Sequence, residues 1–283
     1  MQQVCNKALI NGVESRSVDF ADRGVQYGDG LFTTLRVTGG KPLFLHLHLD
    51  RLESDAARLR ISSPPRAVLT AEARTLAGVL GNGVLKIIVT RGVGGRGYRT
   101  PATADTTRVV SCHPLPDYPA TLAQCGVRVR ICDGILGVNP RLAGIKHLNR
   151  LEQILARAEW DDDEVREGLM LDSEGFVVEG VMSNLFLSKG GRLMTPLLDR
   201  CGVRGVMRSL VTRLGAAEGL PVSEGRVTPA DLIAADELFL TNSVIGLWPI
   251  SQLGDRQFQV GPLTRRMREL LARKTAQEMA CPG

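Results

Sequence analysis

The sequence predicts an α+β fold of two domains, and three observations lead to this prediction. The chain has 283 residues, which is close to the length at which one hydrophobic core divides into two. Hydrophobic residues make up 43% of it and charged residues 23%, the balance of a globular chain that buries a core. Strand-like and helical segments alternate in the first half, whereas strands joined by short turns follow one another in the second half.

A sheet with helices packed on it is expected in the first half. Its strands are predicted at residues 8–10, 32–37, 84–90 and 108–112. One helix is predicted to begin near Leu45, and another to span residues 67–80. In the first of these helices Leu49, Leu52 and Ala56 recur at steps of three and four residues, so they form one apolar face that packs on the sheet.

A proline-rich segment at residues 113–124 separates the two halves. It contains Pro114, Pro116 and Pro119. Because each proline fixes φ and removes an N–H donor, the segment cannot continue a central strand or a helix. We therefore expect an N-terminal domain at residues 1–118, a linker at residues 119–124 and a C-terminal domain at residues 125–283.

Antiparallel strands are expected to dominate the second half. Four short strands are predicted at residues 168–171, 176–181, 184–188 and 193–195. Tight turns such as Ser173-Glu174-Gly175 join them, and strands joined by tight turns pair antiparallel. The other expected elements are strands at residues 127–132 and 237–241, and helices at residues 147–160, 205–214 and 264–277.

The charge pattern fits a small anionic ligand. The net charge is +5, but Lys and Arg are scattered among 30 acidic residues and form no block. Aromatic residues, which stack on nucleobases, make up only 4%, so nucleic-acid binding is not expected. The sequence has no stretch of about 18 uncharged apolar residues and no basic segment followed by an apolar run at its start. We expect a cytoplasmic protein without a membrane span.

The cysteines and histidines do not predict a metal site. The six cysteines are Cys5, Cys112, Cys125, Cys132, Cys201 and Cys281. They form no Cys-x-x-Cys pair and no regular framework, which is typical of reduced thiols in the cytosol. The four histidines form no His-Glu-x-x-His arrangement, so zinc is not expected. His46 and His48 come nearest to a metal pair, but a capping or surface role is favoured for them.

A glycine-rich loop follows the predicted strand at residues 84–90. Residues 92–97 match G-x-G-x-x-G, but a dinucleotide site needs a helix directly after the glycines, and Tyr98-Arg99-Thr100-Pro101 follows instead. The loop is therefore expected to present Arg91, Arg96, Tyr98 and Arg99, and forked guanidinium donors suit a carboxylate. A mobile surface hairpin is the alternative interpretation.

Three further features are candidates for chemistry. In residues 198–208 a loop with two glycines leads into a helix, where free N–H groups can hold a phosphate, although many ordinary loops look the same. Lys146 lies in an apolar setting directly before a predicted helix, and burial there would favour the neutral, nucleophilic amine over the charged ammonium form. The alternative is an ordinary lysine whose side chain reaches solvent. Glu179 interrupts an apolar strand, and it points either to solvent or inward at a cationic partner.

Taken together, these segments resemble the branched-chain and D-amino acid aminotransferase family, the fold-type IV pyridoxal-phosphate enzymes. The resemblance covers nearly the whole chain and rests on residues 22–24, 27–34, 48–52, 91–98, 144–152, 179–184, 205–208 and 240–243. Residues 144–152, Gly-Ile-Lys-His-Leu-Asn-Arg-Leu-Glu, are similar to the aminodeoxychorismate lyase branch. The family implies a small N-terminal α/β sandwich, a larger C-terminal cofactor-binding domain with an antiparallel-rich sheet or barrel, and a homodimer.

The resemblance also implies roles for individual residues. Lys146 is expected to hold pyridoxal 5′-phosphate as a Schiff base, and Glu179 to bind the pyridine nitrogen. The other cofactor-binding residues implied are Arg51, Asn184, Val206, Met207 and Ser243, of which Arg51, the backbone of Val206 and Met207, and the Ser243 hydroxyl would bind the phosphate. Arg96, Tyr98 and Asn242 are implied on the substrate side, and Thr33 or Thr34 near the departing group.

The activity implied by the lyase branch is the conversion of 4-amino-4-deoxychorismate to 4-aminobenzoate and pyruvate. Lys146 would remove the ring proton beside the attached nitrogen. Two alternatives stay open: a D-amino acid or branched-chain aminotransferase of the same fold, and a non-catalytic protein that binds a phosphate ligand. Val206-Met207 departs from the Ile-Thr usual in the aminotransferases, which removes a hydroxyl from the implied phosphate site but keeps the backbone donors.

Overall fold

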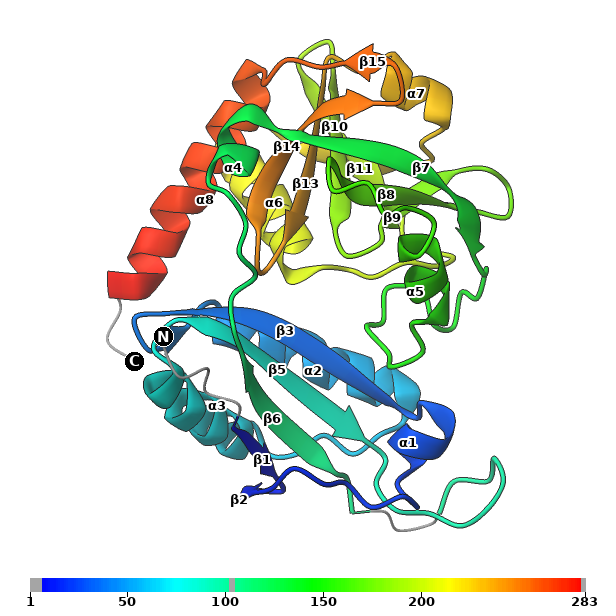
Figure 1. Ribbon diagram of the computed structural model, residues 1–283, viewed down its shortest axis with the longest axis vertical. Helices are drawn as coiled ribbons and strands as arrows, with labels where there is room; N and C mark the ends of the chain where they lie inside the picture. Colours follow the sequence, from blue (N-terminus) through cyan, green and yellow to red (C-terminus); the bar gives the residue numbers. More distant parts are fainter. Residues whose placement is uncertain (1–6, 102–104, 281–283) are drawn as a thin grey trace. The chain divides into compact units, whose positions relative to one another are not determined.

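The computed structural model describes residues 7–101 and 105–280, which pack as two compact units (Figure 1). The first unit takes the described residues of 1–116 together with residues 146–149 and 277–280. The second unit consists of residues 117–145 and 150–276. A short piece around Lys146 therefore belongs to the first unit although the chain on both sides of it belongs to the second.

The first unit is built on a six-stranded antiparallel sheet. Its strands are β1 (Ala8–Ile10), β2 (Val13–Glu14), β3 (Gly30–Thr38), β4 (Lys41–Pro42), β5 (Gly83–Thr90) and β6 (Arg108–His113), in the order β2-β1-β6-β5-β3-β4. The helices are α1 (Arg23–Tyr27), α2 (Leu45–Leu59) and α3 (Arg66–Leu80). The predicted strands and both predicted helices of the first half are confirmed.

Helices α2 and α3 pack on one face of this sheet. Leu35 and Leu85 point from the strands into the same core as Leu49 and Leu52 from α2, and all four are almost fully buried. Each such side chain contributes about 1.5–3 kcal/mol by leaving water. Because side chains alternate across a strand, the residues between the core positions lie on the opposite face of the sheet.

The second unit is built on a nine-stranded sheet that curls (Figure 1). Its strands are β7 (Val127–Leu136), β8 (Val165–Asp172), β9 (Val177–Gly180), β10 (Asn184–Lys189), β11 (Arg192–Pro196), β12 (Val222–Gly225), β13 (Glu237–Asn242), β14 (Gly246–Leu253) and β15 (Arg256–Gln257). The main order is β12-β11-β10-β13-β14-β7-β8-β9, and β15 pairs with β14. Antiparallel pairs outnumber parallel ones, so the expected α+β class with an antiparallel-rich second part is confirmed.

Five helices accompany this sheet. They are α4 (Thr121–Cys125), α5 (Leu151–Arg157), α6 (Val206–Ala217), α7 (Pro229–Ile233) and α8 (Pro262–Ala280), the last counted with this unit as far as Ala276. Helix α4 lies in the segment that was expected to contain neither helix nor strand, and it begins just after the last proline of that segment, Pro119. No helix within residues 7–101 and 105–280 is long and apolar enough to cross a membrane.

Two predicted elements are wrong in detail. The helix expected over residues 147–160 begins only at Leu151, because the preceding backbone pairs with β3: His147 bridges Leu31, and the N–H of Leu148 donates to the Gly30 carbonyl at 3.0 Å. The expected run of four paired strands also breaks once. Strand β9 pairs with β8, whereas β10 pairs with β13.

Candidate active site

Lys146 is held by its backbone against β3 and α2. Its N–H donates to a carboxylate oxygen of Asp55 at 3.1 Å, and its carbonyl accepts from the N–H of Phe32 at 2.9 Å. The Nζ atom of this half-buried side chain lies 4.6 Å from the centroid of the Phe32 ring, a favourable place for a cation. Lys146, predicted from the sequence, is therefore placed by three contacts within the first unit, two made by its backbone and one by its amine.

Arg51 is a half-buried cation on α2. One of its terminal nitrogens donates to the Thr33 hydroxyl at 2.7 Å, while its buried Nε has no hydrogen-bond partner among the described residues. Burial lowers the pKa of Arg51 to about 10, and the Asp55 charge acts in the opposite direction. A buried guanidinium with an unused donor is the arrangement expected of a residue that binds an anion.

His48 completes a small network with Arg51. Its Nδ1 lies 2.6 Å from the Thr33 hydroxyl, and burial, followed by the charge of Arg51, holds the pKa of His48 well below its usual range. The Thr33 hydroxyl therefore lies between the two side chains: its oxygen accepts from Arg51, and the same hydroxyl shares a hydrogen bond with the Nδ1 atom of His48. The hydroxyl of Thr33 is thus used twice inside the core and is fully buried.

Asp55 was not predicted as a site residue. Its carboxylate is almost fully buried, and burial raises its pKa, whereas the Lys146 N–H and the Arg51 charge lower it. Positions 48, 51 and 55 are three and four residues apart, so they share one face of α2. Counting three residues back and four residues forward from Arg51 along the predicted helix would have found His48 and Asp55 from the sequence.

Thr34 and Lys86 lie on the other face of the sheet. They are cross-strand partners of β3 and β5, and Lys86 Nζ lies 4.8 Å from the centroid of the same Phe32 ring as Lys146 Nζ. Burial lowers the pKa of Lys86, which makes no ion pair within the described chain. Lys86 was not predicted, since a single lysine in an apolar strand carries no motif. The structure separates Thr34, beside these amines, from Thr33 in the core.

In the second unit Glu179 points inward. All four residues of β9 are buried, and Glu179 is only 4% exposed, so its strand does not alternate toward solvent. One carboxylate oxygen accepts from the Val203 N–H at 2.9 Å and from the Asn184 amide at 3.2 Å. The same amide donates to the Val203 carbonyl at 2.9 Å. The side chain therefore points inward, as one of the two sequence alternatives has it, but these hydrogen bonds come from neutral donors and not from the cationic partner expected with it.

The start of α6 lies next to Asn184. The Asn184 carbonyl oxygen accepts from the Gly205 N–H at 3.2 Å, and a Cβ at position 205 would approach that oxygen to 2.1 Å. Helix α6 begins with Val206 and Met207, has no side-chain cap at Gly205 and has no acidic residue in its first turn. The first N–H groups of a helix have no acceptor within the helix, so this end offers donors to an anion.

Asn242 and Ser243 lie where β13 turns into β14. The Asn242 amide donates to the Met182 carbonyl at 3.1 Å, and its oxygen accepts from the N–H groups of Val244 and Ile245. Asn242 thus ties this turn to the turn between β9 and β10. Its substrate-binding role and the phosphate role of Ser243, which is half-buried, stay predictions.

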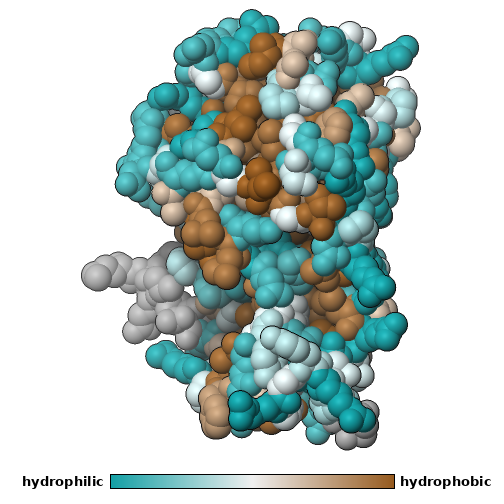
Figure 2. Space-filling view, turned by 90° about the vertical axis from the view of Figure 1, so that its right-hand side faces the viewer, coloured by the Kyte–Doolittle hydropathy of each residue, from teal (hydrophilic) through white to brown (hydrophobic). Residues whose placement is uncertain are grey.

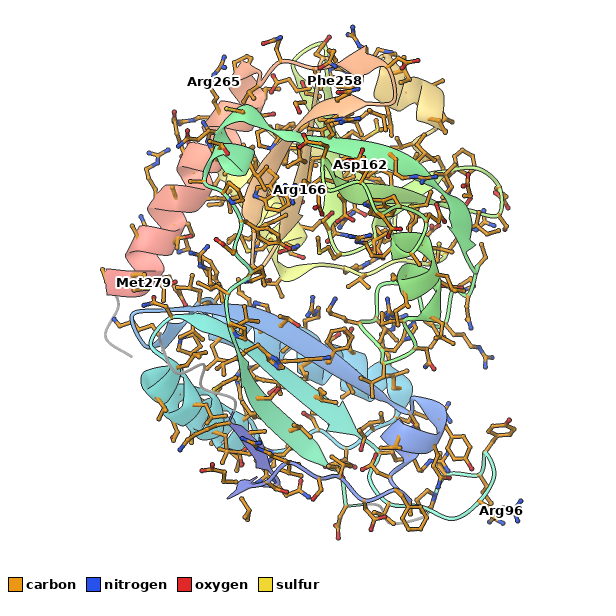
Figure 3. The ribbon with its side chains drawn as sticks, in the orientation of Figure 1. Arg96, Asp162, Arg166, Phe258, Arg265 and Met279 are labelled. Carbon is orange, nitrogen blue, oxygen red and sulfur yellow. The ribbon has the colours of Figure 1, made fainter. Side chains whose placement is uncertain are left out.

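The glycine-rich loop after β5 presents some of its predicted residues but not all. Arg91 is held by Asp29 at 2.7 Å and by the carbonyl groups at the end of α2, so it is not presented. Tyr98 is 88% exposed and makes an edge contact with Tyr27. Figure 3 shows Arg96 at the tip of the loop, pointing away from the sheet of the first unit. Residues 98–101 and 105–107, which follow the glycines and are described, form no helix.

Metal ligands do not gather in the described parts of the chain. No group of three His, Cys, Asp or Glu residues there is placed to hold a metal ion. Cys125, Cys132 and Cys201 are free thiols, the Cys112 thiol donates to the Leu76 carbonyl at 3.8 Å, and Cys5 and Cys281 lie outside the described residues. Burial raises the pKa of Cys132 and of Cys201 to about 12, so neither is a reactive thiolate.

Comparison with known proteins gives consistent matches over nearly the whole chain. The family described as amino-transferase class IV matches residues 30–253. An aminodeoxychorismate lyase of Vibrio harveyi is 36% identical over 264 residues, which cover 91% of this chain and 97% of the relative. A putative branched-chain-amino-acid aminotransferase of Methanocaldococcus jannaschii is 33% identical, with 93% and 94% of the two chains covered.

Solved structures show the same relationship. The crystal structure of 4-amino-4-deoxychorismate lyase from Pseudomonas aeruginosa has a TM-score of 0.91 and 47% identity, covering 94% of this chain and 98% of that one. The branched-chain amino acid aminotransferase of Escherichia coli has a TM-score of 0.83 with 23% identity over 94% and 93% of the chains, which shows a shared fold.

Proposed function

Because this chain belongs to the class IV aminotransferase family, we propose that it is a pyridoxal-phosphate-dependent lyase that converts 4-amino-4-deoxychorismate to 4-aminobenzoate and pyruvate. The observation that carries the choice of reaction is the 47% identity, over 94% of the chain, to a 4-amino-4-deoxychorismate lyase. The relative from Vibrio harveyi supports the same reaction at 36% identity. The aminotransferases of Methanocaldococcus jannaschii and Bacillus licheniformis are 33% and 28% identical.

The described residues fit the cofactor. Arg51 offers a buried, partly unused guanidinium for the phosphate, and the uncapped start of α6 at Val206 and Met207 offers backbone donors. Glu179 offers a fixed carboxylate for a protonated ring nitrogen, and Lys146 offers a placed amine for covalent attachment. Pyridoxal phosphate, when bound, supplies an electron-accepting ring next to the attached nitrogen of the substrate.

Each site residue then has a defined role. Lys146 would hold the cofactor through Nζ, and once the substrate's amine has taken its place, the freed Lys146 amine would remove the substrate's ring proton. Loss of that proton would break the C–O bond and expel the enolpyruvyl group, which takes up a proton to become pyruvate, while the ring becomes aromatic. Asp55 keeps the Lys146 backbone in place, while Asn184 keeps Glu179 in place. Ser243 adds a hydroxyl to the phosphate site.

On the substrate side we assign Thr34 rather than Thr33 to the departing group. Thr33 is fully buried and bonded to Arg51 and His48, whereas Thr34 shares a sheet face with Phe32, above which Lys146 Nζ lies. Lys86, on the same face, is suited to a substrate carboxylate. Arg96, Tyr98 and Asn242 are further candidates for carboxylate recognition, as the family implies.

One assay decides between the reactions. Purified protein loaded with pyridoxal phosphate is incubated with 4-amino-4-deoxychorismate, and 4-aminobenzoate and pyruvate are measured in equal amounts; Lys146→Ala is the control and forms neither. Borohydride treatment should attach the cofactor irreversibly at Lys146, as seen by peptide mass. Release of a keto acid from D-alanine or a branched-chain amino acid, without 4-aminobenzoate from the chorismate substrate, would instead establish an aminotransferase. Absence of cofactor attachment would leave only a binding protein.

We also propose a homodimer in the cytoplasm. Leu151, Ile154 and Leu155 on α5 are each more than half exposed and share one helix face, and Figure 2 shows apolar atoms gathered on this side of the second unit. A second copy of the chain would cover them. Light scattering should give twice the chain mass of 30.6 kDa for the wild type and a lower mass for Leu155→Glu. The free thiols of Cys125, Cys132 and Cys201 suit a reducing compartment.

A further inference from the structure

Glu167 on β8 is a buried carboxyl group that the proposed reaction does not use. It is 2% exposed, and it forms no ion pair in the described parts of the chain. Burial raises the pKa of Glu167 to about 7, against the opposing effect of its hydrogen bonds. A carboxyl group buried without a cation is costly, so the donors around it indicate what it holds in place.

Most of these donors come from the short turn between β9 and β10. One oxygen of Glu167 accepts from the Ser183 hydroxyl at 2.7 Å and from the Met182 N–H at 3.2 Å. Its other oxygen accepts from the N–H of Gly168, the next residue on its own strand, at 3.1 Å. Its carboxyl group therefore links the middle of β8 to the turn formed by residues 181–183.

The turn is packed tightly against Glu167. A Cβ at Gly180 would lie 2.4 Å from the Ser183 hydroxyl oxygen and 3.0 Å from the Glu167 carboxyl carbon, so only glycine allows this approach. The Gly180 N–H donates to the Ser183 carbonyl at 2.8 Å, which closes the turn. The two residues that flank it, Glu179 and Asn184, are the pair whose side chains bind each other at 3.2 Å.

From these contacts we infer that Glu167 is a positioning residue: its carboxyl group fixes the turn from Gly180 to Ser183 and thereby sets the place of Glu179 and Asn184 at the two ends of that turn. The inference rests on the proposed function only in so far as Glu179 and Asn184 bind the cofactor. The effect of Glu167 on the turn does not depend on whether the protein binds a cofactor.

The test compares Glu167→Gln with Glu164→Gln at pH 8. Glu164 is exposed and precedes β8, so its substitution makes the same chemical change without touching the turn. In Glu167→Gln an amide N–H₂ faces the Met182 N–H, or the Gly168 N–H if the amide is reversed, so one donor loses its acceptor. Hydrogen–deuterium exchange of the protein without cofactor should become at least about ten-fold faster in peptides covering residues 179–184, and should be unchanged in Glu164→Gln.

The second measurement is the affinity for pyridoxal phosphate, titrated by absorbance well below the melting temperature. We expect the dissociation constant to rise about ten-fold in Glu167→Gln, which corresponds to about 1.4 kcal/mol, and to stay the same in the control. Ser183→Ala removes one of the two turn contacts, so it should give a smaller rise of about three-fold, and it provides the same test if Glu167→Gln does not fold.

The outcomes separate the two proposals. A lower melting temperature with unchanged exchange of residues 179–184 and unchanged cofactor affinity overturns the inference, because Glu167 would then serve only general stability. If the wild type does not bind pyridoxal phosphate at all, the proposed function fails, and the exchange experiment still decides whether Glu167 fixes the turn. Faster exchange with unchanged affinity overturns the link from the turn to Glu179.

Discussion

Helix α2 supplies its site residues from one face, whereas the second unit assembles its own from a turn, a loop and the start of a helix. In the first unit, His48, Arg51 and Asp55 follow helical spacing. In the second, Glu179 is bound by Val203, a residue far away in the sequence. A local spacing rule therefore describes the first group of residues, and only the tertiary fold describes the second.

The two groups also differ in how fully the protein hydrogen-bonds their charged side chains. Arg51 keeps a buried donor unused, while Glu179 receives hydrogen bonds from neutral groups of its own unit. The Glu179 carboxylate is held by hydrogen bonds from the protein itself, but the Arg51 guanidinium is only partly satisfied. We expect substitutions at Arg51 to change ligand affinity more than stability, and substitutions around Glu179 to change both.

Arg51→Met gives the largest expected effect. Hydrogen bonds to charged groups contribute about 1.5–3 kcal/mol each, so the dissociation constant for pyridoxal phosphate should rise about 10- to 100-fold. Removing a half-buried cation that forms no ion pair in the described chain should not lower the free energy of unfolding of the cofactor-free protein. Absorbance titration and urea denaturation measure the two quantities. A clear loss of stability with normal cofactor affinity would make Arg51 a structural residue.

Gly205→Ala tests the second group by a steric change. The added Cβ would lie 2.1 Å from the Asn184 oxygen, so Asn184 must move and its hold on Glu179 weakens. We expect an unfolding free energy lower by about 1–3 kcal/mol and a cofactor affinity lower by about ten-fold. Gly78→Ala on α3 is the matched control, since no atom lies within 4 Å of its added Cβ, and alanine favours a helix. Equal behaviour of the two variants would contradict the assigned role of Asn184.

The third prediction concerns pH and Glu167. Its pKa is raised from 4.5 to about 7 in the folded protein, so the folded state holds the proton more tightly than the unfolded state between these values. The contribution of this group to stability is present in full below about pH 4.5 and is lost as the pH rises to 7, with a slope of at most about 1.4 kcal/mol per pH unit. Chemical denaturation of the cofactor-free protein across this range should show the slope in the wild type and a smaller one in Glu167→Gln.

Two neighbours do not interfere with that measurement. Burial raises the pKa of Tyr118 above 10 and that of Cys132 to about 12, so both stay neutral from pH 4.5 to 7. Parallel curves for wild type and Glu167→Gln would show that Glu167 does not titrate in this range. In that case the charge of Glu167 would not account for its contacts with the turn.

The sequence predicted the fold class and most elements, because periodic apolar residues mark them, as Leu49 and Leu52 do for α2. It did not predict the pairing of residues 146–148 with β3, which delays the start of α5, since such pairing depends on the tertiary fold. Glu179 was singled out as an oddity in an apolar strand, but its donors were not foreseeable. Glu167 was missed for the same reason: its partners lie across a turn that no motif marks.

Lys86→Met has the smallest expected effect on the protein and the most specific one on the reaction. The Lys86 amine is half-buried, burial lowers its pKa, and it makes no ion pair in the described chain, so its loss should leave the free energy of unfolding unchanged or slightly higher. If it meets a substrate carboxylate, the KM for 4-amino-4-deoxychorismate should rise about ten-fold, with kcat changed less than about two-fold. Lys189→Met, at an exposed position on β10, is the control. A lower stability with unchanged KM would mean that Lys86 has a structural role and does not bind the substrate.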